Sequence, residues 1–331
     1  MKRATQSGAA LLLAMLTVTL VATFASAALW QQWRSVEIES AERSRMQMQW
    51  VLNGALDWSR LILQEHARSA NPTVDHLSEV WAQPLQEARL SSFLAVDQNN
   101  TDDAMDAFLS GQIIDQQGLL NVRNLVQEGK PVASAVQSFE QLFTKLNLPT
   151  TQVQLLVDKL IASDAAAATP NTSTDTKTAA QVDAPLKPYR LEQLVWFGLP
   201  ASTVHALKPY AVLLPVKTLL NLNTASAEVL RAALPNFDLG RAQQLVTQRA
   251  SAHFKTVNEA FKAAGITDDA AGRAHKDDFS VGSNYFAVRG RLRLGDITVQ
   301  ELSLVERSNT LVKVIWRQRE VLQEAAAASL Q

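Results

Sequence analysis

Cysteine is absent from this sequence of 331 residues, and glycine is scarce, with 12 residues. Without cysteine the chain has no disulfide, no thiolate zinc or iron–sulfur site and no cysteine nucleophile. Few glycines disfavour glycine-rich phosphate-binding loops and all-β barrels with many tight turns. The charges nearly cancel, with 31 Lys and Arg against 32 Asp and Glu. A formal net charge of −1 does not indicate a nucleic-acid binder by composition.

The sequence also lacks the short motifs of common enzymes, namely HExxH, GxSxG, GxGxxG and the P-loop. Asp75, His76 and Glu79 are close enough along the chain for a small acid–base cluster, but no nucleophile motif accompanies them. The histidines are scattered, and we interpret each as a surface or capping residue: His66, His76, His205, His253 and His275. We therefore expect no enzyme, and an anchored hydrolase has no catalytic constellation to support it.

One long hydrophobic run covers residues 9–29 and follows Lys2 and Arg3. As a helix it would be about 32 Å long, enough to cross a hydrocarbon core of about 30 Å. Three interpretations compete: a secretory signal peptide cleaved at residues 25–27, a plain membrane anchor, and a prepilin-type leader that ends at Gly8. Gly8 lies where the polar residues meet the apolar run, so a protease at the cytoplasmic membrane face could reach its backbone. We therefore favour the third interpretation.

The helical pattern continues well past the membrane-length run. No Pro or Gly occurs from residue 30 until Gly54, and Leu56, Ile62 and Leu63 then fall on one helix face. A stop signal first occurs at residues 71–72, Asn-Pro, which predicts a continuous helix from residue 9 to about 68, roughly 90 Å long. The basic amino terminus is expected in the cytoplasm, so the rest of the chain lies outside the inner membrane.

Beyond this helix, a weak internal repeat relates residues 119–124 to 219–224 and predicts two small helical units. We expect a mobile loop over the Ala/Thr-rich residues 163–188, and a helix over 225–234 capped by Asn223 or Thr224. Residues 285–316 alternate like strands, with turn signals at 295–296 and 308–309, and predict an antiparallel three-stranded meander. The fold class is therefore α+β, with an inserted helical region.

The second helical unit also resembles a helix-hairpin-helix, a module that binds DNA phosphates through glycine amides. Its hairpin, however, has Asn236 and Asp238 in place of the first turn glycines, and a carboxylate repels phosphate. Between residues 217 and 265 the charge is only mildly basic. We expect this scaffold to make protein contacts, and we keep a membrane-anchored periplasmic DNA-binding protein as the alternative.

Together these pieces resemble the type II secretion protein K family, the largest minor pseudopilin of the general secretion pathway. The resemblance covers nearly the whole chain, and the segments that carry it are the leader boundary at Gly8 and residues 114–121, 221–230 and 283–286. It implies an α+β fold with a pilin-like long N-terminal helix, an antiparallel sheet, and a large inserted all-α domain of two SAM-like, helix-hairpin-helix-like units.

The resemblance implies the following division of the chain: a prepilin leader (1–8), the transmembrane part of the helix (9–29), the rest of the helix with the first part of the pilin-like domain (30–118), two SAM-like units (119–218 and 219–280), the pilin-like sheet (281–320) and a tail (321–331).

The resemblance also implies how the amino terminus is processed. Prepilin peptidase would cut between Gly8 and Ala9 and methylate Ala9. The fifth mature residue is then Leu13, where most pseudopilins carry a Glu that pairs with the subunit ahead. Because an unpaired charge in the bilayer costs at least about 3 kcal/mol, Leu13 suits a first subunit with none ahead of it.

The function implied by the resemblance is that of a minor pseudopilin, which caps the pseudopilus tip and helps to initiate its assembly for export of folded proteins across the outer membrane. The implied partners are minor pseudopilins I and J, the major and other pseudopilins, prepilin peptidase and inner-membrane lipid, whereas nucleic acid is not expected. The chain would be a single-pass inner-membrane protein with its C-terminal domain in the periplasm.

Calcium is the one cofactor that the resemblance implies, through an acidic cluster after the first helical unit. This chain keeps Asp164 there but has Ala162 where an acid would be expected. Other carboxylates that could bind calcium lack the regular spacing of a known loop, so we favour a solvated acidic surface for them: Asp268, Asp269, Asp277 and Asp278.

The leader interpretation predicts that a bulky residue at Gly8 blocks processing, because the peptidase needs access to an unencumbered backbone there. The measurement is amino-terminal sequencing of the mature protein from membranes, for wild type and a Gly8→Leu variant. Wild type should begin at Ala9 and the variant should keep its leader and lose secretion. A mature chain that begins near Ala28 would instead indicate ordinary secretion.

Overall fold

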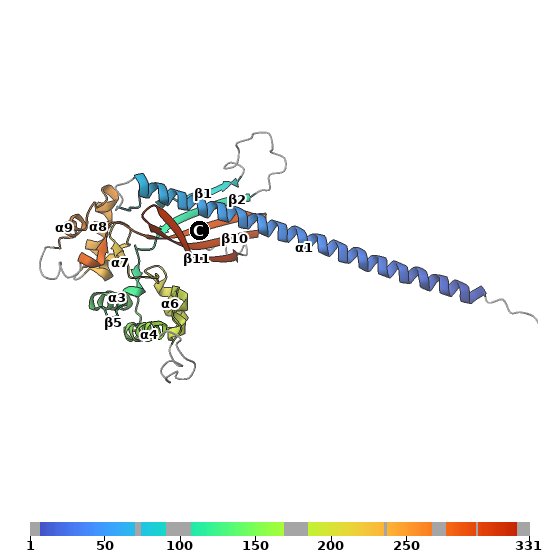
Figure 1. The fold of residues 1–331 in the computed structure, drawn as a ribbon, viewed down its shortest axis with the longest axis horizontal. Coiled ribbons are helices and arrows are strands. Elements are labelled where there is room, and N and C mark those ends of the chain that lie inside the picture. Colours follow the sequence, from blue (N-terminus) through green and yellow to red (C-terminus); the bar gives the residue numbers. More distant parts are fainter. Residues whose placement is uncertain are drawn as a thin grey trace, which may run out of the picture. The chain divides into compact units, whose positions relative to one another are not determined.

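The computed structural model describes residues 7–69, 74–90, 107–168, 185–234, 237–266, 276–295 and 297–322 (Figure 1). The predicted helix stop at residues 71–72 and the tail after residue 322 lie outside these ranges. The chain divides into two compact units, Met1–Gly54 and Ala55–Gln331, and each is described by itself.

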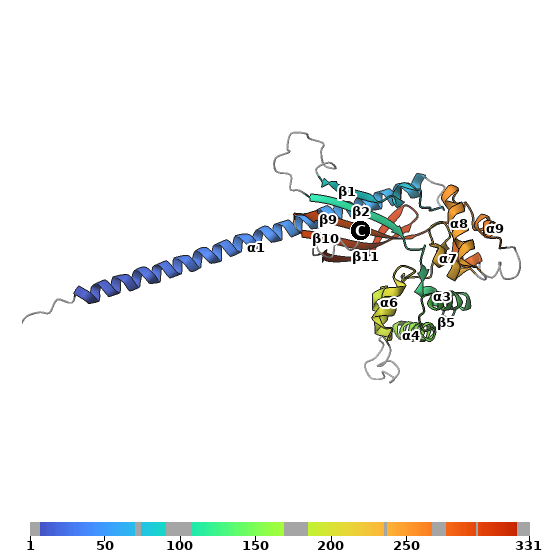
Figure 2. The ribbon, with the colours of Figure 1, turned by 180° about the vertical axis from the view of Figure 1, so that it is seen from behind.

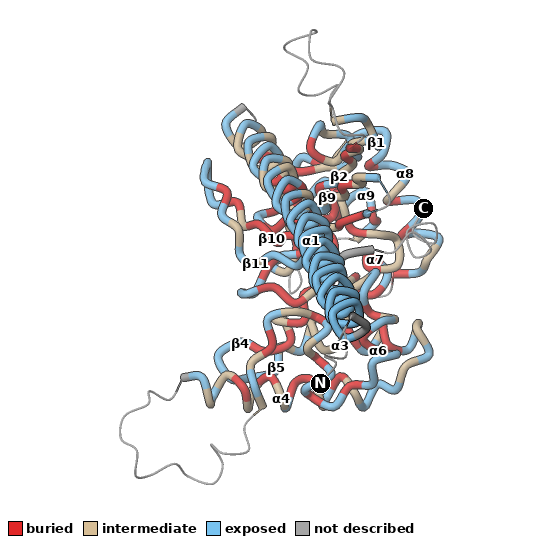
Figure 3. Tube along the Cα trace, turned by 90° about the vertical axis from the view of Figure 1, so that its right-hand side faces the viewer, coloured by how far each residue is buried: buried red, intermediate tan, exposed pale blue. Residues whose placement is uncertain are grey.

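The first unit consists, in its described part, of the beginning of α1, a helix of 63 residues over Ser7–Ser69 that continues into the second unit. This bears out the prediction of one continuous helix. Residues 9–43 are exposed throughout (Figure 3). By length and composition the helix could cross a membrane, with a mean hydropathy of 2.1 over its most apolar window. Three threonine hydroxyls in this run donate to carbonyls three residues earlier: Thr17, Thr19 and Thr23. Such bonds satisfy a hydroxyl inside a bilayer, where no water is available.

The second unit is built on a five-stranded antiparallel sheet of order β1-β2-β9-β10-β11. Its strands are β1 (Leu85–Arg89), β2 (Ala107–Asp115), β9 (Tyr285–Leu294), β10 (Ile297–Ser308) and β11 (Leu311–Leu322). The last three form the meander predicted from residues 285–316. Asn309 adopts a positive φ of 53° in the two-residue turn between β10 and β11, a conformation that asparagine tolerates better than most residues.

The sheet is interrupted in sequence but not in space. β2 pairs with β9 from Ala107 opposite Leu294 to Asp115 opposite Phe286. The chain therefore leaves the sheet after Asp115 and returns beside that point at Tyr285, so residues 116–284 form an insertion between two neighbouring strands.

Within the second unit, the end of α1 packs against one face of this sheet (Figures 1 and 2). Leu56 and Leu63 are buried in one cluster with Trp81 and Phe286, whose rings meet edge to face at 5.1 Å. Arg60 reinforces the contact because its guanidinium donates to the carbonyl of Val312 at 2.8 and 3.0 Å. The apolar helix face that the sequence predicts is thus the face that covers the sheet.

The insertion has two groups of helices (Figures 1 and 2), which pack against each other. The first holds α3 (Ala133–Lys145), α4 (Thr151–Ala168) and α6 (Ala201–Leu207), with the 3-10 helices η2 (Val122–Leu125) and η3 (Leu191–Phe197). The second holds α7 (Ala227–Ala233), α8 (Leu239–Ser251) and α9 (Val257–Ala263), followed by η4 (Lys276–Asp278). One continuous hydrophobic cluster runs through both groups.

The α+β class holds, but the insertion is not purely helical, which corrects the expectation of an all-α inserted domain. Its described residues contain three two-stranded pairs: β3 (Leu120–Asn121) with β6 (Ala211–Val212), β4 (Val126–Gln127) with β5 (Lys130–Pro131), and β7 (Leu220–Asn221) with β8 (Phe279–Ser280). These strands are only two residues long, too short for an alternating pattern to mark them in sequence.

The internal repeat has a physical basis in two of these strands. β3 and β7 each pair in parallel with a partner from the end of their own helical group. The side-chain oxygen of Asn121 accepts from Arg123 N at 3.0 Å, and that of Asn221 accepts from Asn223 N at 2.9 Å. Both asparagines therefore turn the chain in the same way after their strand.

Two local predictions are wrong. α7 begins at Ala227 and its N-cap is Ser226, because Asn223 is occupied instead by both backbone polar groups of Phe254. The expected loop over 163–188 is wrong for its first residues, since residues 163–168 belong to α4. Residues 169–184 lie outside the described residues.

The packing of α1 predicts that Leu63→Ala lowers the free energy of unfolding by about 2–5 kcal/mol, since Leu63 is fully buried and its loss leaves a cavity. Leu61 lies on the same helix but is 59% exposed, so Leu61→Ala is the matched control, with an expected effect under about 0.5 kcal/mol. Denaturant unfolding of the full chain in detergent micelles measures both. Equal losses would show that this helix face does not pack as described.

Candidate functional site at the junction of sheet and insertion

The predicted processing residues lie at the start of α1. Gly8 and Ala9 are in its first turn, and the Leu13 side chain is 69% exposed. Cleavage at Gly8, methylation of Ala9 and the significance of Leu13 remain predictions.

The candidate calcium ligands do not gather into one site among the described residues. Asp164 is paired with Arg123 and Lys187. Asp278 accepts a hydrogen bond from Ser134 Oγ at 2.7 Å and lies 3.7 Å from Lys217 Nζ, whereas Asp277 is exposed. Asp268 and Asp269 lie outside the described residues.

The most elaborate polar site surrounds Asp115, the last residue of β2, at the point where the chain leaves the sheet. Its side chain is buried, and Oδ1 accepts from Gln117 N at 2.8 Å. Oδ2 accepts from Thr224 Oγ1 and Ser283 Oγ, each at 2.6 Å, and from Asn221 Nδ2 at 3.0 Å. One carboxylate thus joins the outgoing chain, the middle of the insertion and the returning chain.

Gln117, two residues after Asp115, also joins the outgoing chain to the middle of the insertion and to the returning chain. Its Nε2 donates to the carbonyl of Leu219 at 2.9 Å, and its Oε1 accepts from Asn284 N at 2.6 Å. Its backbone carbonyl accepts from Asn221 N at 2.8 Å. Next to it, Gly118 is required by close packing, because a Cβ there would lie 2.9 Å from the Thr224 hydroxyl that binds Asp115.

A buried ion pair anchors the segment after α1 to this junction. Arg307 on β10 donates to Asp75 Oδ2 at 2.6 Å, and both side chains are at most 6% exposed. Asp75 Oδ2 also accepts from Ser283 N, and the Asp75 carbonyl accepts from Asn221 Nδ2 at 3.1 Å. Removing one partner of such a pair leaves a buried charge, which typically costs about 3–5 kcal/mol.

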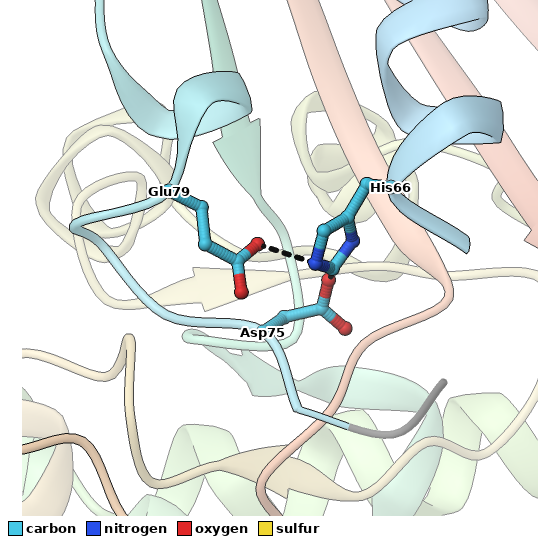
Figure 4. A group of neighbouring side chains, drawn as sticks. All are labelled: His66, Asp75 and Glu79. Atoms are coloured by element: carbon cyan, nitrogen blue, oxygen red, sulfur yellow. Dashed lines mark ion pairs between the residues drawn. The ribbon is translucent and has the colours of Figure 1, made fainter. Parts of the chain in front are cut away.

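His66, near the end of α1, completes the cluster shown in Figure 4. Its Nδ1 lies 3.0 Å from Arg307 Nη1, and because arginine can only donate, Nδ1 is the acceptor. The ring proton is then on Nε2, which lies 2.9 Å from Glu79 Oε2. Trp81 Nε1 donates to the same Glu79 oxygen.

His76 connects this cluster to the second helical group. Its ring stacks on His253, with the ring centroids 3.8 Å apart, and its Nε2 lies 3.3 Å from Glu79 Oε1. Burial lowers the pKa of His76, and the neighbouring His253 acts in the same direction, against the carboxylate of Glu79. The acid–base cluster predicted at Asp75, His76 and Glu79 therefore forms, but it sits in a structural network.

Burial has the opposite effect on the buried carboxyl at the junction. It raises the pKa of Asp115 to about 6, against the lowering effect of the hydrogen bonds from Ser283 and Thr224. The pKa of this carboxyl therefore lies about two units above the ordinary aspartate value of 3.8.

The cluster already holds a positive charge. Ligand-type atoms of His66, Asp75 and Glu79 lie within 4.8 Å of one another, which is close enough for a shared metal ion. The guanidinium of Arg307, however, bonds two of these three residues, so a divalent cation would have to displace it. We assign these residues a structural task, which is to fix the insertion on the sheet.

Three sequence segments that carry the family resemblance meet at this junction: residues 114–121, 221–230 and 283–286. The sequence indicates Asp75 only as part of a possible acid–base cluster and does not indicate Arg307 at all. The pair is separated by 232 residues, so no local pattern could have indicated it. The available signal was weaker: Arg307 is a charge in the strongly alternating β10 sequence.

Comparisons with known proteins agree over most of the chain. Two family models described as type II secretion system (T2SS), protein K match residues 118–216 and 220–282. Type II secretion system protein K of Pseudomonas aeruginosa is 26% identical over 91% of this chain and 89% of its own length. The protein of that name from Pectobacterium carotovorum subsp. carotovorum is also 26% identical, over 96% of this chain and 97% of its own.

A solved structure shares the fold. The crystal structure of the GspK-GspI-GspJ complex from the enterotoxigenic Escherichia coli Type 2 Secretion System contains a chain with a TM-score of 0.63 to this one. The two are 22% identical, and the match covers 85% of this chain and 98% of that chain. The long amino-terminal helix combined with an antiparallel sheet is therefore an architecture already observed.

The raised pKa of Asp115 predicts a specific pH dependence of stability. The folded state holds the Asp115 proton more tightly than the unfolded state does. The protonated carboxyl therefore adds to the free energy of unfolding in full below about pH 4, and this addition is lost as the pH rises through about 6. The shift from 3.8 to about 6 corresponds to about 3 kcal/mol.

Replacing the carboxyl by an amide removes this dependence. The stability difference between wild type and Asp115→Asn should shrink, or turn in favour of the variant, between pH 4 and 6 and then stay constant. Unfolding midpoints of the full chain across this range measure it. Asp277→Asn, at an exposed aspartate, is the control and should follow wild type. A constant difference for Asp115→Asn would show that this carboxyl does not titrate in that window.

Proposed function

The chain belongs to the type II secretion system protein K family, and on this premise we propose that it is a minor pseudopilin that caps the pseudopilus tip and helps to initiate its assembly. The observation that carries the proposal is the match to protein K relatives over nearly the whole chain. The proposed role is structural rather than enzymatic: the chain starts a fibre that drives folded proteins across the outer membrane.

Minor pseudopilins I and J are the proposed partners at the tip. The protein with the shared fold was crystallised as GspK with GspI and GspJ, which supports an equivalent complex for this chain. By the same proposal the tip complex rests on the major and other pseudopilins, and prepilin peptidase acts on the precursor in the inner membrane.

The start of α1 is long and apolar enough to cross a membrane, which supports a single-pass anchor in the inner membrane. We propose that the peptidase cuts between Gly8 and Ala9, that Ala9 is methylated, and that the remainder of the chain after the span is periplasmic. The helix supports this order because it begins at Ser7 and continues without a break to Ser69, so cleavage at Gly8 would leave the membrane span attached.

Leu13 is the residue that fits a terminal position. A Glu at mature position five is useful only when a subunit ahead supplies an amino terminus to pair with it. Without that partner a carboxylate at this depth would cost at least about 3 kcal/mol. An apolar residue at position 13 is therefore consistent with a subunit that has none ahead.

The insertion would supply the bulk of the tip. We propose that it consists of two SAM-like units, residues 119–218 and 219–280. The matched ranges of the two family models end and begin on either side of this boundary, at 216 and 220, and the strands β3 and β7 repeat the same pairing in each unit.

The DNA-binding alternative has local chemistry against it. The side chain of Asp238 accepts from Arg241 N at 2.8 Å and caps α8. In a helix-hairpin-helix the amides of such a helix start would receive a phosphate, but here the Asp238 carboxylate already accepts from one of them and would repel the phosphate. The matches to known proteins do not support this alternative either.

Complementation of a deletion strain tests the proposed function. Wild type should restore export of folded proteins to the medium. A Leu13→Glu variant should restore it poorly or change the order of assembly, because its charge has no partner in the bilayer, whereas Leu13→Ile should behave as wild type. Secreted protein in the medium is the readout, with immunoblots of membranes to show equal amounts of each variant.

Co-purification provides the second measurement. The full chain, expressed with minor pseudopilins I and J, should be recovered with both after extraction from membranes. Full export by Leu13→Glu would contradict the argument for a terminal position. Absence of any complex with I and J would contradict the tip assignment itself.

A further inference from the structure

Asp164 lies at the meeting point of three parts of the first helical group. It belongs to the last turns of α4, which ends at Ala168. Arg123, in η2, places Nη2 2.7 Å from each of the two Asp164 oxygens. Lys187, which follows the segment of residues 169–184, places Nζ 3.3 Å from Oδ1. The three side chains are only 17–33% exposed.

A carboxylate near the end of a helix needs a positive partner. The carbonyls of the last turn give a helix C-terminus partial negative charge, so an acidic side chain there is unfavourable unless a cation lies close. A calcium ion, which the family resemblance implies for this region, would meet that need. Two basic side chains would meet it equally well.

The residues around Asp164 do not fit calcium. Calcium takes six to eight oxygen ligands at about 2.3–2.6 Å, typically with several carboxylates. Here the neighbouring position 162 is alanine, and the Ser163 hydroxyl is buried and donates to the carbonyl of Leu160 at 2.9 Å. Among the described residues, Arg123 and Lys187 already surround the Asp164 carboxylate, so these three side chains have a formal charge of +1 and would repel a divalent ion.

We infer that the side-chain triad Arg123–Asp164–Lys187 replaces a calcium ion in this chain, and that the insertion keeps its fold without calcium. The triad ties the end of α4 to η2, 41 residues earlier, and to the residues that follow 184. The inference goes beyond the proposed function, because it uses the family resemblance but not the assembly of the tip.

Calcium dependence of the full chain is the first test. Thermal unfolding of the purified protein in detergent micelles is followed with excess calcium and with excess EGTA, and calcium is titrated by calorimetry. We expect the same unfolding midpoint in both conditions and no heat of calcium binding. A midpoint lowered by EGTA, or saturable binding of calcium, would overturn the inference.

Variants of the triad are the second test. Asp164→Asn should lower the midpoint by about 2–4 °C with or without calcium. Its difference from wild type should shrink in high salt, because a partly exposed ion pair is screened. Asp158→Asn, at an exposed aspartate of the same helix, is the matched control and should change little.

A double-mutant cycle keeps the triad test independent of general destabilisation. Arg123→Gln and Asp164→Asn should each lower the midpoint, and the double variant should lose less than the sum of the two. Strictly additive losses, or a loss in Asp164→Asn that occurs only when calcium is present, would contradict the triad. The proposed function is tested by complex formation with minor pseudopilins I and J, which is a separate measurement. Absence of that complex would therefore not change the unfolding midpoints that test the triad.

Discussion

A buried carboxylate at the end of β2 holds the second unit together, because the chain crosses between sheet and insertion twice at that place. β2 and β9 are neighbours in register up to Asp115 and Phe286, yet a whole helical insertion separates them in sequence. Chain that leaves a sheet loses its ladder of hydrogen bonds, and buried polar groups must find other partners. Asp115 and Gln117 provide them on the outgoing side, and Ser283 and Asn284 on the returning side.

The same junction receives the end of α1. Asp75 follows the helix and pairs with Arg307 of β10, and His66 binds both that arginine and Glu79. The polar network thus joins helix, sheet and insertion, while the apolar cluster of Leu63, Trp81 and Phe286 fills the space between helix and sheet.

Local elements were largely predictable. The long helix follows from unbroken periodicity and the absence of Pro before residue 72, and the meander follows from alternation between two turn signals, since both depend on residues close in sequence. The cap of α7 was mispredicted because Asn223 and Ser226 are both good capping residues, and only the distant Phe254 decides between them. The short strand pairs were missed because two residues cannot display a period.

The sequence by itself determined the membrane-length amino terminus, the α+β class and the family resemblance, since each depends on composition, period or ordered motifs along the chain. Only the tertiary structure decided what the charged residues do. Arg307 finds Asp75 across 232 residues, and Arg123 finds Asp164 across 41. The position of a charged residue in the sequence does not identify its partner, because the packing of the hydrophobic cores decides which segments come together. That is why Asp164, read in sequence as a possible calcium ligand, proves in the folded chain to be already neutralised.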